Sequence, residues 1–363
     1  MIRLTKPYFG KEELAAIASV LSSGHLSRGP KIAEFEAAVA GYLDVKHAIA
    51  VSSGTAALHL SVLALGLGAG DEVIVPDFTF PATANAVALA GADPVLCDVG
   101  LESFNIDPEE ISTLVTSRTK AIMVVHQFGL AADMDRIGRV AEDKGLWLIE
   151  DAACALGATY HGRKCGTFGK LACFSFHPRK ITTTGEGGMV ATNDDQIGRQ
   201  VRALRDHGLA DGDFLFPGFN YRMSDLNAAL GSVQQSRIDF LIEQRRNLAA
   251  LYASRLAGIE AIALPGDFQG SKHTFQSYVV RLARNVERTR FLNYLRESEI
   301  ESTIGTYAVH CVRYYEARKS LAPRSLMRSA EAYSQTVTLP LFPGMTADEV
   351  NYVCDKIIAY LGL

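Results

Sequence analysis

The chain has little that would place it in a membrane, in an oxidising compartment or on nucleic acid. Its 363 residues include one tryptophan and six cysteines, and no apolar stretch is long enough to span a bilayer. The formal net charge is −4 and long basic runs are missing, which argues against nucleic acid and acidic membranes as partners. The start, Met1 to Lys6, shows no signal-peptide core. We therefore expect a cytoplasmic protein with no membrane or nucleic-acid partner.

The cysteines and histidines show no metal-binding pattern. The nine histidines are scattered without an H-E-x-x-H motif, and the six cysteines lack paired metal spacing. The cysteines are Cys97, Cys154, Cys165, Cys173, Cys311 and Cys354. Because they show no such spacing, we expect reduced thiols and no metal site.

Alternating helix and strand patterns predict an α/β fold. A hydrophobic content of 48% over 363 residues can fill a large core, typical of a chain with two domains. Short apolar runs predict strands at 72–76, 94–99, 121–125, 146–150, 171–176 and 188–192, and helical periodicity predicts helices around 14–21, 82–90 and 134–144. This alternation indicates a mostly parallel sheet with helices on both faces.

The second part of the chain predicts a smaller α+β domain. A helical stretch without proline, 224–256, would link the domains, and its pair Arg245-Arg246 is typical of a solvated helix face. The elements expected beyond it are a loop at 258–270, a strand at 277–282 and helices near 287–297 and 347–361. We place the boundary between a large domain, 1–245, and a small C-terminal domain, 246–363.

The most informative segment leads from an apolar strand to Lys180 and then to a glycine-rich turn. Ser175 lies near the end of that strand, and Gly185-Glu186-Gly187-Gly188 follows the lysine. A neutral lysine amine can form a Schiff base with a carbonyl, and a hydroxyl beside bare backbone suits a phosphate. The segment therefore favours a phosphorylated carbonyl cofactor. The alternative is a surface lysine next to a turn.

An acidic residue, Asp151, follows another predicted strand. Leu146-Trp147-Leu148-Ile149-Glu150-Asp151 is a short apolar run that ends in acid, as buried parallel strands do. Asp151 would lie at the carboxyl end of the strand, where open α/β sheets bind their ligands. A carboxylate there can keep a pyridine nitrogen protonated, as in enzymes that use pyridoxal 5'-phosphate (PLP). The alternative is a helix cap or a strand-end turn.

A third segment, Val51-Ser52-Ser53-Gly54-Thr55, opens a predicted helix. Backbone N–H groups and hydroxyls at a helix start form an anion site. The alternative is an ordinary capped helix. The anion site is favoured over it because the chain also carries Lys180 and a second turn suited to phosphate, Gly185–Gly188.

Over nearly its whole length the chain resembles the DegT/StrS sugar aminotransferases. These are PLP-dependent enzymes of fold type I that aminate keto sugars, usually linked to nucleotides, for amino-sugar and polysaccharide biosynthesis. The matching motifs, in order, are Ser27–Pro30, Ser53–Leu58, Pro76–Phe80, Glu150–Ala153, Ser175–Lys180, Gly185–Gly188, Gly218–Met223 and Leu339–Leu341. Several motifs in the right order make the resemblance specific. It implies a fold type I large domain and a smaller C-terminal domain.

The resemblance also implies residue roles. Lys180 would form the Schiff base and move the proton, and Asp151 would pair with the pyridine nitrogen. Phe80 would stack on the cofactor ring, although it could otherwise be a core phenylalanine. Asn220 would reach the phosphate of a neighbouring subunit, giving a homodimer with shared sites, although it could otherwise belong to a plain turn. The phosphate contacts within the chain would come from Gly54, Thr55 and Ser175.

The chain departs from the family pattern at Cys154. Family members usually carry Gln or His three residues after the aspartate, where the side chain contacts the cofactor hydroxyl. A thiol is a weak donor and acceptor, so we expect this contact to be weakened or replaced. His126, after the strand at 121–125, could substitute for it or be structural.

The function implied is transfer of an amino group, from L-glutamate by resemblance, to a nucleotide-linked keto sugar. Sugar and nucleotide would be read by 205–219 and 306–315, where Tyr307, His310 and Arg313 could meet substrate or pack a domain surface. In sugar dehydratases of the family histidine replaces the lysine, so Lys180 argues against that branch. The remaining alternatives are a fold type I lyase acting on an amino acid, with Cys311 as its mobile thiol, and a PLP-binding sensor without turnover.

Overall fold

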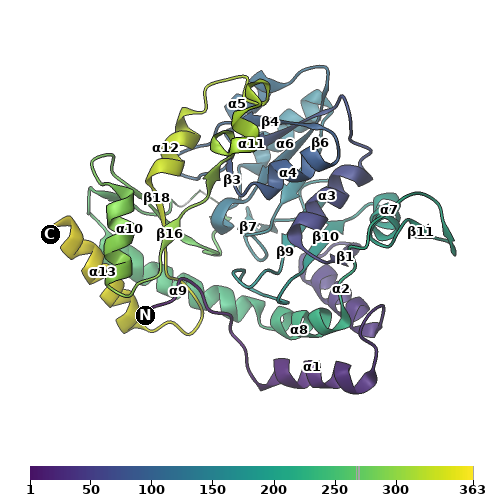
Figure 1. Cartoon of the computed structure of the whole chain (residues 1–363), viewed down its shortest axis with the longest axis horizontal. Coiled ribbons are helices and arrows are strands. Elements are labelled where there is room, and N and C mark those ends of the chain that lie inside the picture. Colours follow the sequence, from purple (N-terminus) through teal and green to yellow (C-terminus); the bar gives the residue numbers. More distant parts are fainter. Residues whose placement is uncertain (267, 269, 363) are drawn as a thin grey trace.

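The computed structural model describes residues 1–266, 268 and 270–362, and its larger part is built on a seven-stranded sheet (Figure 1). The strand order is β1-β10-β9-β6-β5-β2-β4. Within it β10 is antiparallel to both neighbours, and the pairs from β9 to β4 are parallel. The bounds are β1 (His47–Val51), β2 (Glu72–Pro76), β4 (Asp93–Cys97), β5 (Thr119–Val125), β6 (Trp147–Asp151), β9 (Leu171–Ser175) and β10 (Gly188–Thr192).

Both faces of this sheet are buried under helices. Successive side chains of a strand point to opposite faces, so Ile74 packs in one core while its neighbours Val73 and Val75 pack in the other. The helices on the Ile74 face are α2 (Pro30–Leu43), α5 (Pro108–Leu114), α6 (Met134–Lys144) and α8 (Asp225–Ser236), and those opposite are α3 (Gly54–Ala64), α4 (Ala82–Leu89) and α7 (Asp195–Arg205). Near-continuous apolar strands follow from this two-sided burial.

The C-terminal part carries a second, antiparallel sheet with its own core. Its strands are β13 (Ile262–Ala263), β15 (Tyr278–Leu282), β18 (Thr336–Leu339) and β16 (Thr303–Ile304), in that order. Helices α9 (Ile238–Leu256), α10 (Arg288–Glu297) and α13 (Ala347–Leu361) pack on it. In Figure 1, α8 and α9 run one after the other above α1, from below the large sheet toward α13. The predicted α/β fold with a smaller α+β part is confirmed, and the boundary at residue 245 stays a prediction.

The remaining elements belong to neither of these two sheets. The helices are α1 (Lys11–Ser23), α11 (Arg313–Glu316), α12 (Met327–Gln335) and the 3-10 turns Gln127–Gly129, Val309–Cys311 and Lys319–Leu321. The strands are β3 (Phe78–Thr79), β7 (Thr159–Tyr160), β8 (Arg163–Lys164), β11 (Leu209–Ala210), β12 (Asp213–Phe214), β14 (Ser271–Lys272) and β17 (Tyr307–Ala308). Strand β3 pairs with β17, so the end of β2 lies beside a segment from late in the chain.

Three sequence predictions need correction. The helical stretch 224–256 is divided at Arg237 into α8 and α9. The loop expected at 258–270 contains β13, and its residues 267 and 269 lie outside the described part. Arg245 does not lie on a solvated face: it is 1% exposed, because its guanidinium donates to three backbone carbonyls.

Two features are absent from the described residues. No helix there combines the length and the apolar character needed to cross a membrane. No group of three or more His, Cys, Asp or Glu in the same residues is arranged to hold a metal ion.

Candidate active site

The predicted site residues come from segments that follow the carboxyl ends of neighbouring strands. Asp151 ends β6 and Ser175 ends β9, and these strands are parallel. Strand β1, which leads to Gly54, runs the same way because β10 is antiparallel to both β1 and β9. The sheet therefore brings these positions to one edge, where α/β folds bind ligands.

Lys180 is half-buried and its amine contacts a thiol. Lys180 Nζ donates to Cys154 Sγ at 3.1 Å. The lysine belongs to the irregular segment between β9 and β10, where its N–H donates to the carbonyl of His177 at 2.8 Å. The residue that departs from the family pattern is thus the neighbour of the lysine amine. This contact favours a site lysine over a lysine free in solvent.

Asp151 is a buried carboxylate, 5% exposed. Its Oδ2 accepts from Thr83 Oγ1 at 2.8 Å, and its Oδ1 accepts from the N–H of Ala153 at 3.1 Å. Burial raises the pKa of the carboxyl, while the Thr83 hydroxyl, the Ala153 N–H and the charge of Lys180 act in the opposite direction. Sequence reasoning missed Thr83, and its place after Phe80 in the chain is the single hint it gives.

His126 cannot replace the missing cofactor contact, which corrects that hypothesis. It is fully buried, and its Nδ1 accepts from the N–H of Ala132 at 3.1 Å. Its Nε2, which therefore carries the proton, donates to Glu150 at 2.8 Å. The carboxylate of Glu150 also accepts from the N–H groups of Gly166, Phe168 and Gly169. His126 and Glu150 hold the backbone behind Asp151.

The start of α3 and the end of β9 pack too closely for side chains between them. A Cβ on Gly54 would lie 2.8 Å from the Ser175 Cβ, and a Cβ on Gly188 would lie 2.3 Å from the Ser53 carbonyl oxygen. Ser53 caps α3 by accepting from the N–H of Ala56. The Ser175 hydroxyl therefore lies beside the first turn of α3, and Thr55 there is exposed. This is a cradle for an anion.

Phe80 is not a core residue. It is 63% exposed, whereas Phe78 is buried completely. The carbonyl of Phe80 accepts from the N–H of Thr83, the residue whose hydroxyl donates to Asp151. The ring of Tyr307 lies 6.3 Å away, centroid to centroid, at an interplanar angle of 63°. An exposed aromatic ring on the segment that carries Thr83 is available to stack on a ligand ring.

The three predicted substrate residues differ in how firmly they are held. Tyr307 pairs with Thr79 across β17 and β3. His310 is fixed by Asp77, whose Oδ1 accepts from the His310 N–H at 2.8 Å and whose Oδ2 lies 2.6 Å from Nδ1. The hydrogen bond to Asp77 raises the pKa of His310. Arg313 is exposed on α11.

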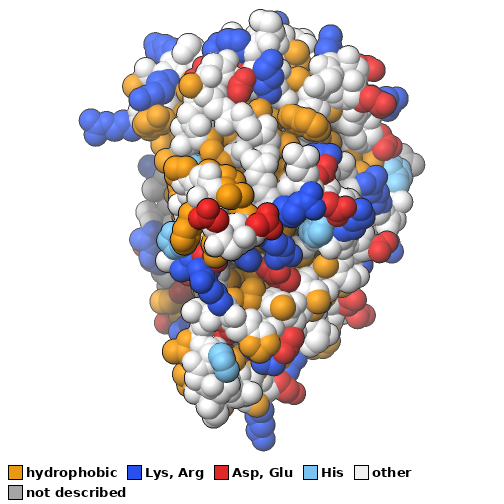
Figure 2. Space-filling model, turned by 90° about the vertical axis from the view of Figure 1, so that its right-hand side faces the viewer, with side chains coloured by type: hydrophobic (Ala, Val, Ile, Leu, Met, Phe, Trp, Pro, Cys, Tyr) orange, Lys and Arg blue, Asp and Glu red, His pale blue; other side chains and the backbone are white. Residues whose placement is uncertain are grey.

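Asn220 lies at the base of a projecting hairpin. It bridges to Asp206, and β11 and β12 form the hairpin beyond. The carbonyl of the next residue, Tyr221, accepts from the N–H of Ser52 at 2.7 Å, so this segment runs beside the approach to Gly54. Figure 2 looks at the side of the molecule where β11 lies and shows hydrophobic side chains exposed among charged ones. On the hairpin, Phe214 is 66% and Leu215 58% exposed.

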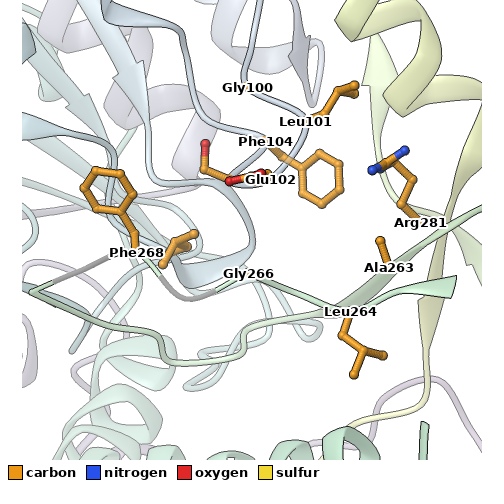
Figure 3. A pocket seen from close by; sticks show the side chains of 11 residues that line it. Gly100, Leu101, Glu102, Phe104, Ala263, Leu264, Gly266, Phe268 and Arg281 are labelled. Atoms are coloured by element: carbon orange, nitrogen blue, oxygen red, sulfur yellow. The ribbon is translucent and has the colours of Figure 1, made fainter. Parts of the chain in front are cut away.

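A cavity of about 480 Å³ lies elsewhere, between the loop after β4 and the strands of the second sheet. Figure 3 shows Glu102 and Phe104 on one wall and Ala263, Leu264 and Arg281 on the other. None of the predicted site residues lines it. The candidate site is therefore defined by side-chain chemistry at the sheet edge.

These residues together fit PLP. The first turn of α3, with the exposed Thr55 and the adjacent Ser175 hydroxyl, suits a phosphate, and the buried Asp151 carboxyl suits a protonated ring nitrogen. Phe80 offers a ring face, and Lys180 offers an amine near the same edge. Such an arrangement suits chemistry in which a lysine moves a proton at a carbon next to an amine.

The fold and this site define an α/β enzyme of fold type I. The chain belongs to the DegT/DnrJ/EryC1/StrS aminotransferase family, whose model matches residues 7–358. It is therefore an aminotransferase, and the resemblance seen in the sequence is confirmed.

Three similar proteins illustrate the match. GDP-perosamine synthase of Caulobacter vibrioides is 42% identical over 341 residues, which cover 92% of this chain and 90% of that protein. The solved structure of DesV from S. venezuelae, in complex with a ketimine intermediate, has a TM-score of 0.92 at 35% identity and covers 96% of this chain and 94% of its own. The PLP form of the putative sugar aminotransferase Spr1654 from Streptococcus pneumoniae has a TM-score of 0.93 at 26% identity, covering 99% of each chain.

Proposed function

We propose that this aminotransferase uses PLP to transfer the amino group of L-glutamate to a nucleotide-linked keto sugar. The observation that carries the proposal is the convergence of Lys180, Asp151, Phe80 and the Gly54–Ser175 cradle at one sheet edge. The sugar substrate is supported by the likeness to GDP-perosamine synthase. When bound, PLP supplies a carbonyl for the amine and an electron-withdrawing ring.

The chain's own residues hold and move the proton. Lys180 Nζ removes a proton from the carbon that bears the amine and returns one to the neighbouring position. Positioned proton transfer of this kind contributes roughly 10²–10⁴-fold to rate. Asp151 keeps a ring nitrogen protonated, and Thr83 and the Ala153 N–H hold Asp151 in its place. Cys154, which contacts Lys180 Nζ, would take the position next to the cofactor hydroxyl.

The substrate residues are proposed from their charge and position. Because the pKa of His310 is raised by Asp77, its imidazole stays cationic to higher pH than an ordinary histidine. Arg313 is an exposed guanidinium on the same segment, and such a group suits a diphosphate. Tyr307, beside Phe80, is placed to contact the sugar.

We also propose that the protein is a homodimer with shared sites. The projecting hairpin exposes Phe214 and Leu215, which a second copy would cover, and it carries Asn220 at its base. Asn220 would then reach the phosphate in the partner's cradle.

The direct test is product formation. The purified protein, loaded with PLP, is incubated with L-glutamate and one nucleotide-linked keto sugar at a time, with GDP-, UDP- and dTDP-linked compounds as the panel. We expect 2-oxoglutarate and an amino sugar in equal amounts, read by mass spectrometry, with one of these compounds. If no keto sugar in the panel is converted to an amino sugar, the proposed acceptor is contradicted.

A further inference from the structure

The backbone on both sides of Lys180 is held by a single side chain from late in the chain. Gln276 Oε1 accepts from the N–H of Ile181 at 2.9 Å, and Gln276 Nε2 donates to the carbonyl of Arg179 at 2.5 Å. One planar amide thus bonds the two peptide groups that adjoin Lys180. Gln276 itself is buried. Two hydrogen bonds from one rigid group fix both position and orientation of the backbone between them.

The segment around Lys180 has no regular secondary structure, so its shape depends on such contacts. Phe176, at the start of the segment, is bonded to two residues beyond Lys180. Its carbonyl accepts from the Thr184 N–H at 3.0 Å and from Thr183 Oγ1 at 2.8 Å. Gln276 acts on the other part, where the lysine is attached. A lysine side chain is long and flexible, so the reach of Nζ is set first by where its backbone stands.

Gln276 is in turn fixed by two separate sets of contacts. The neighbouring residues are bonded to the turn after β5: the N–H of Thr274 donates to Gly129 at 3.0 Å and that of Ser277 to Phe128 at 3.3 Å. The carbonyl of Gln276 accepts from Arg245 Nη1 at 3.2 Å.

Arg245 ties this segment to the second core. Its Nη1 also donates to the carbonyls of Phe275 at 3.2 Å and Leu341 at 3.0 Å. The side chain is buried, so it holds the segment without competition from water. A continuous set of hydrogen bonds therefore runs from α9 through Gln276 to the peptides of Lys180.

We propose that Gln276 is a positioning residue for the reaction, and that it aims Lys180 Nζ by holding both of its flanking peptides. The inference rests on the proposed function, in which Lys180 moves the proton. Misplacing a reacting group by about 1 Å can cost roughly 10²-fold in rate. Gln276 would thus affect proton transfer while touching neither substrate nor cofactor.

The test compares Gln276→Met, which removes both hydrogen bonds, with the natural protein loaded with PLP. We expect the single-turnover rate constant with L-glutamate, per bound cofactor, to fall about 10- to 100-fold. The apparent Kd for L-glutamate and the amount of PLP retained should stay within about 2-fold, because the buried Gln276 amide is bonded to the backbone beside Lys180. Hydrogen exchange of the Ile181 amide, read by mass spectrometry without glutamate, should become about 10-fold faster.

The matched control is Gln234→Met. Gln234 is an equally buried glutamine, whose Nε2 donates to Tyr8 and Glu13, and no contact joins it to the Lys180 segment in the described structure. This variant should leave both the rate constant and the Ile181 exchange unchanged. If Gln276→Met does not fold, Gln276→Glu decides, because the carboxylate keeps the shape but cannot donate to Arg179. It too should slow single turnover.

Two outcomes overturn the inference. A variant at Gln276 that reacts as fast as the natural protein per bound cofactor would show that the two hydrogen bonds of Gln276 do not position Lys180. An equal loss in Gln234→Met would assign the effect to general destabilisation. A natural protein that binds no PLP or does not react with glutamate would instead refute the proposed function and its donor, so the two failures are distinguishable.

Discussion

Thr83 decides how well Asp151 can serve as an acceptor for a protonated ring. Burial alone raises the pKa of the Asp151 carboxyl, which favours the neutral form. The Thr83 hydroxyl donates to Oδ2 and so favours the ionised form. A neutral carboxyl could not hold the ring nitrogen in its protonated state, so the balance at this one residue matters for rate.

Thr83→Val should lower turnover roughly 10- to 100-fold, since a hydrogen bond to a charged group contributes roughly 1.5–3 kcal/mol. Without the hydroxyl, the raised pKa of Asp151 would rise further, so the carboxyl would hold its proton to higher pH. The acid limb of the kcat/KM profile should therefore move to higher pH. A pH profile of the PLP-loaded variant measures both effects.

Thr79→Val is the matched control. Its hydroxyl lies 3.0 Å from that of Thr83 but does not bond Asp151, and both residues are buried. We expect a smaller loss and an unmoved acid limb. Equal profiles for Thr83→Val and the natural protein would show that Asp151 does not depend on this bond.

Among single residues, the sequence predicts those proposed to take part in the reaction itself. It misses the residues that hold them in place by hydrogen bonds. Lys180 and Asp151 are suggested by a lysine before a glycine-rich turn and an acid at a strand end. Thr83 and Gln276 act by hydrogen bonds to residues 68 or more positions away, or to backbone. Such partners depend on tertiary packing, which no local pattern encodes.

Among the elements, those with strong end signals are predicted to the residue. The helix Met134–Lys144 begins after the capping side chain of Asp133 and ends at Gly145, whose left-handed φ is +64°. Strand Gly188–Thr192 also matches the prediction. The break at Arg237 was missed because neither Gly nor Pro marks it. The burial of Arg245 was missed because its acceptors are carbonyls of distant segments.

The β11–β12 hairpin is the element from which we expect the dimer contact. Its apolar residues Phe214 and Leu215 are both more than half exposed within the described chain. The double change Phe214→Ser with Leu215→Ser should shift the protein from dimer to monomer, measured by light scattering after gel filtration. PLP should bind more weakly in the monomer, because Asn220 could no longer reach a partner's cradle.

Met327→Ser is the control for this experiment, since Met327 is a large exposed side chain on α12 and not on the hairpin. It should leave the dimer intact. A natural protein that is monomeric at micromolar concentration, or a hairpin variant that dimerises as well as the control, would contradict the assignment.

For the whole molecule, the proposed site draws on residues from both the large part and the C-terminal part of the chain. The large sheet supplies Asp151 and Ser175, and the segment between β9 and β10 supplies Lys180. The chain beyond α9 supplies Gln276 and Tyr307. Family membership explains why the overall arrangement could be expected from motifs spread over the chain. The identity of the sugar could not be expected in this way, because no sequence pattern gives the conformation of residues 306–315, from which we propose the substrate contacts.

The proposal that Lys180 carries the reaction between PLP and L-glutamate is tested most directly by absorbance. The spectrum of the PLP-loaded protein is recorded before and after L-glutamate for the natural chain, Lys180→Ala and Lys120→Ala. Lys120 is an exposed lysine at the start of β5 and controls for the loss of one amine. We predict a visible band that moves to shorter wavelength with glutamate in the natural protein and in Lys120→Ala, and no conversion in Lys180→Ala. Conversion in Lys180→Ala, or a natural protein that shows no band, would contradict the account.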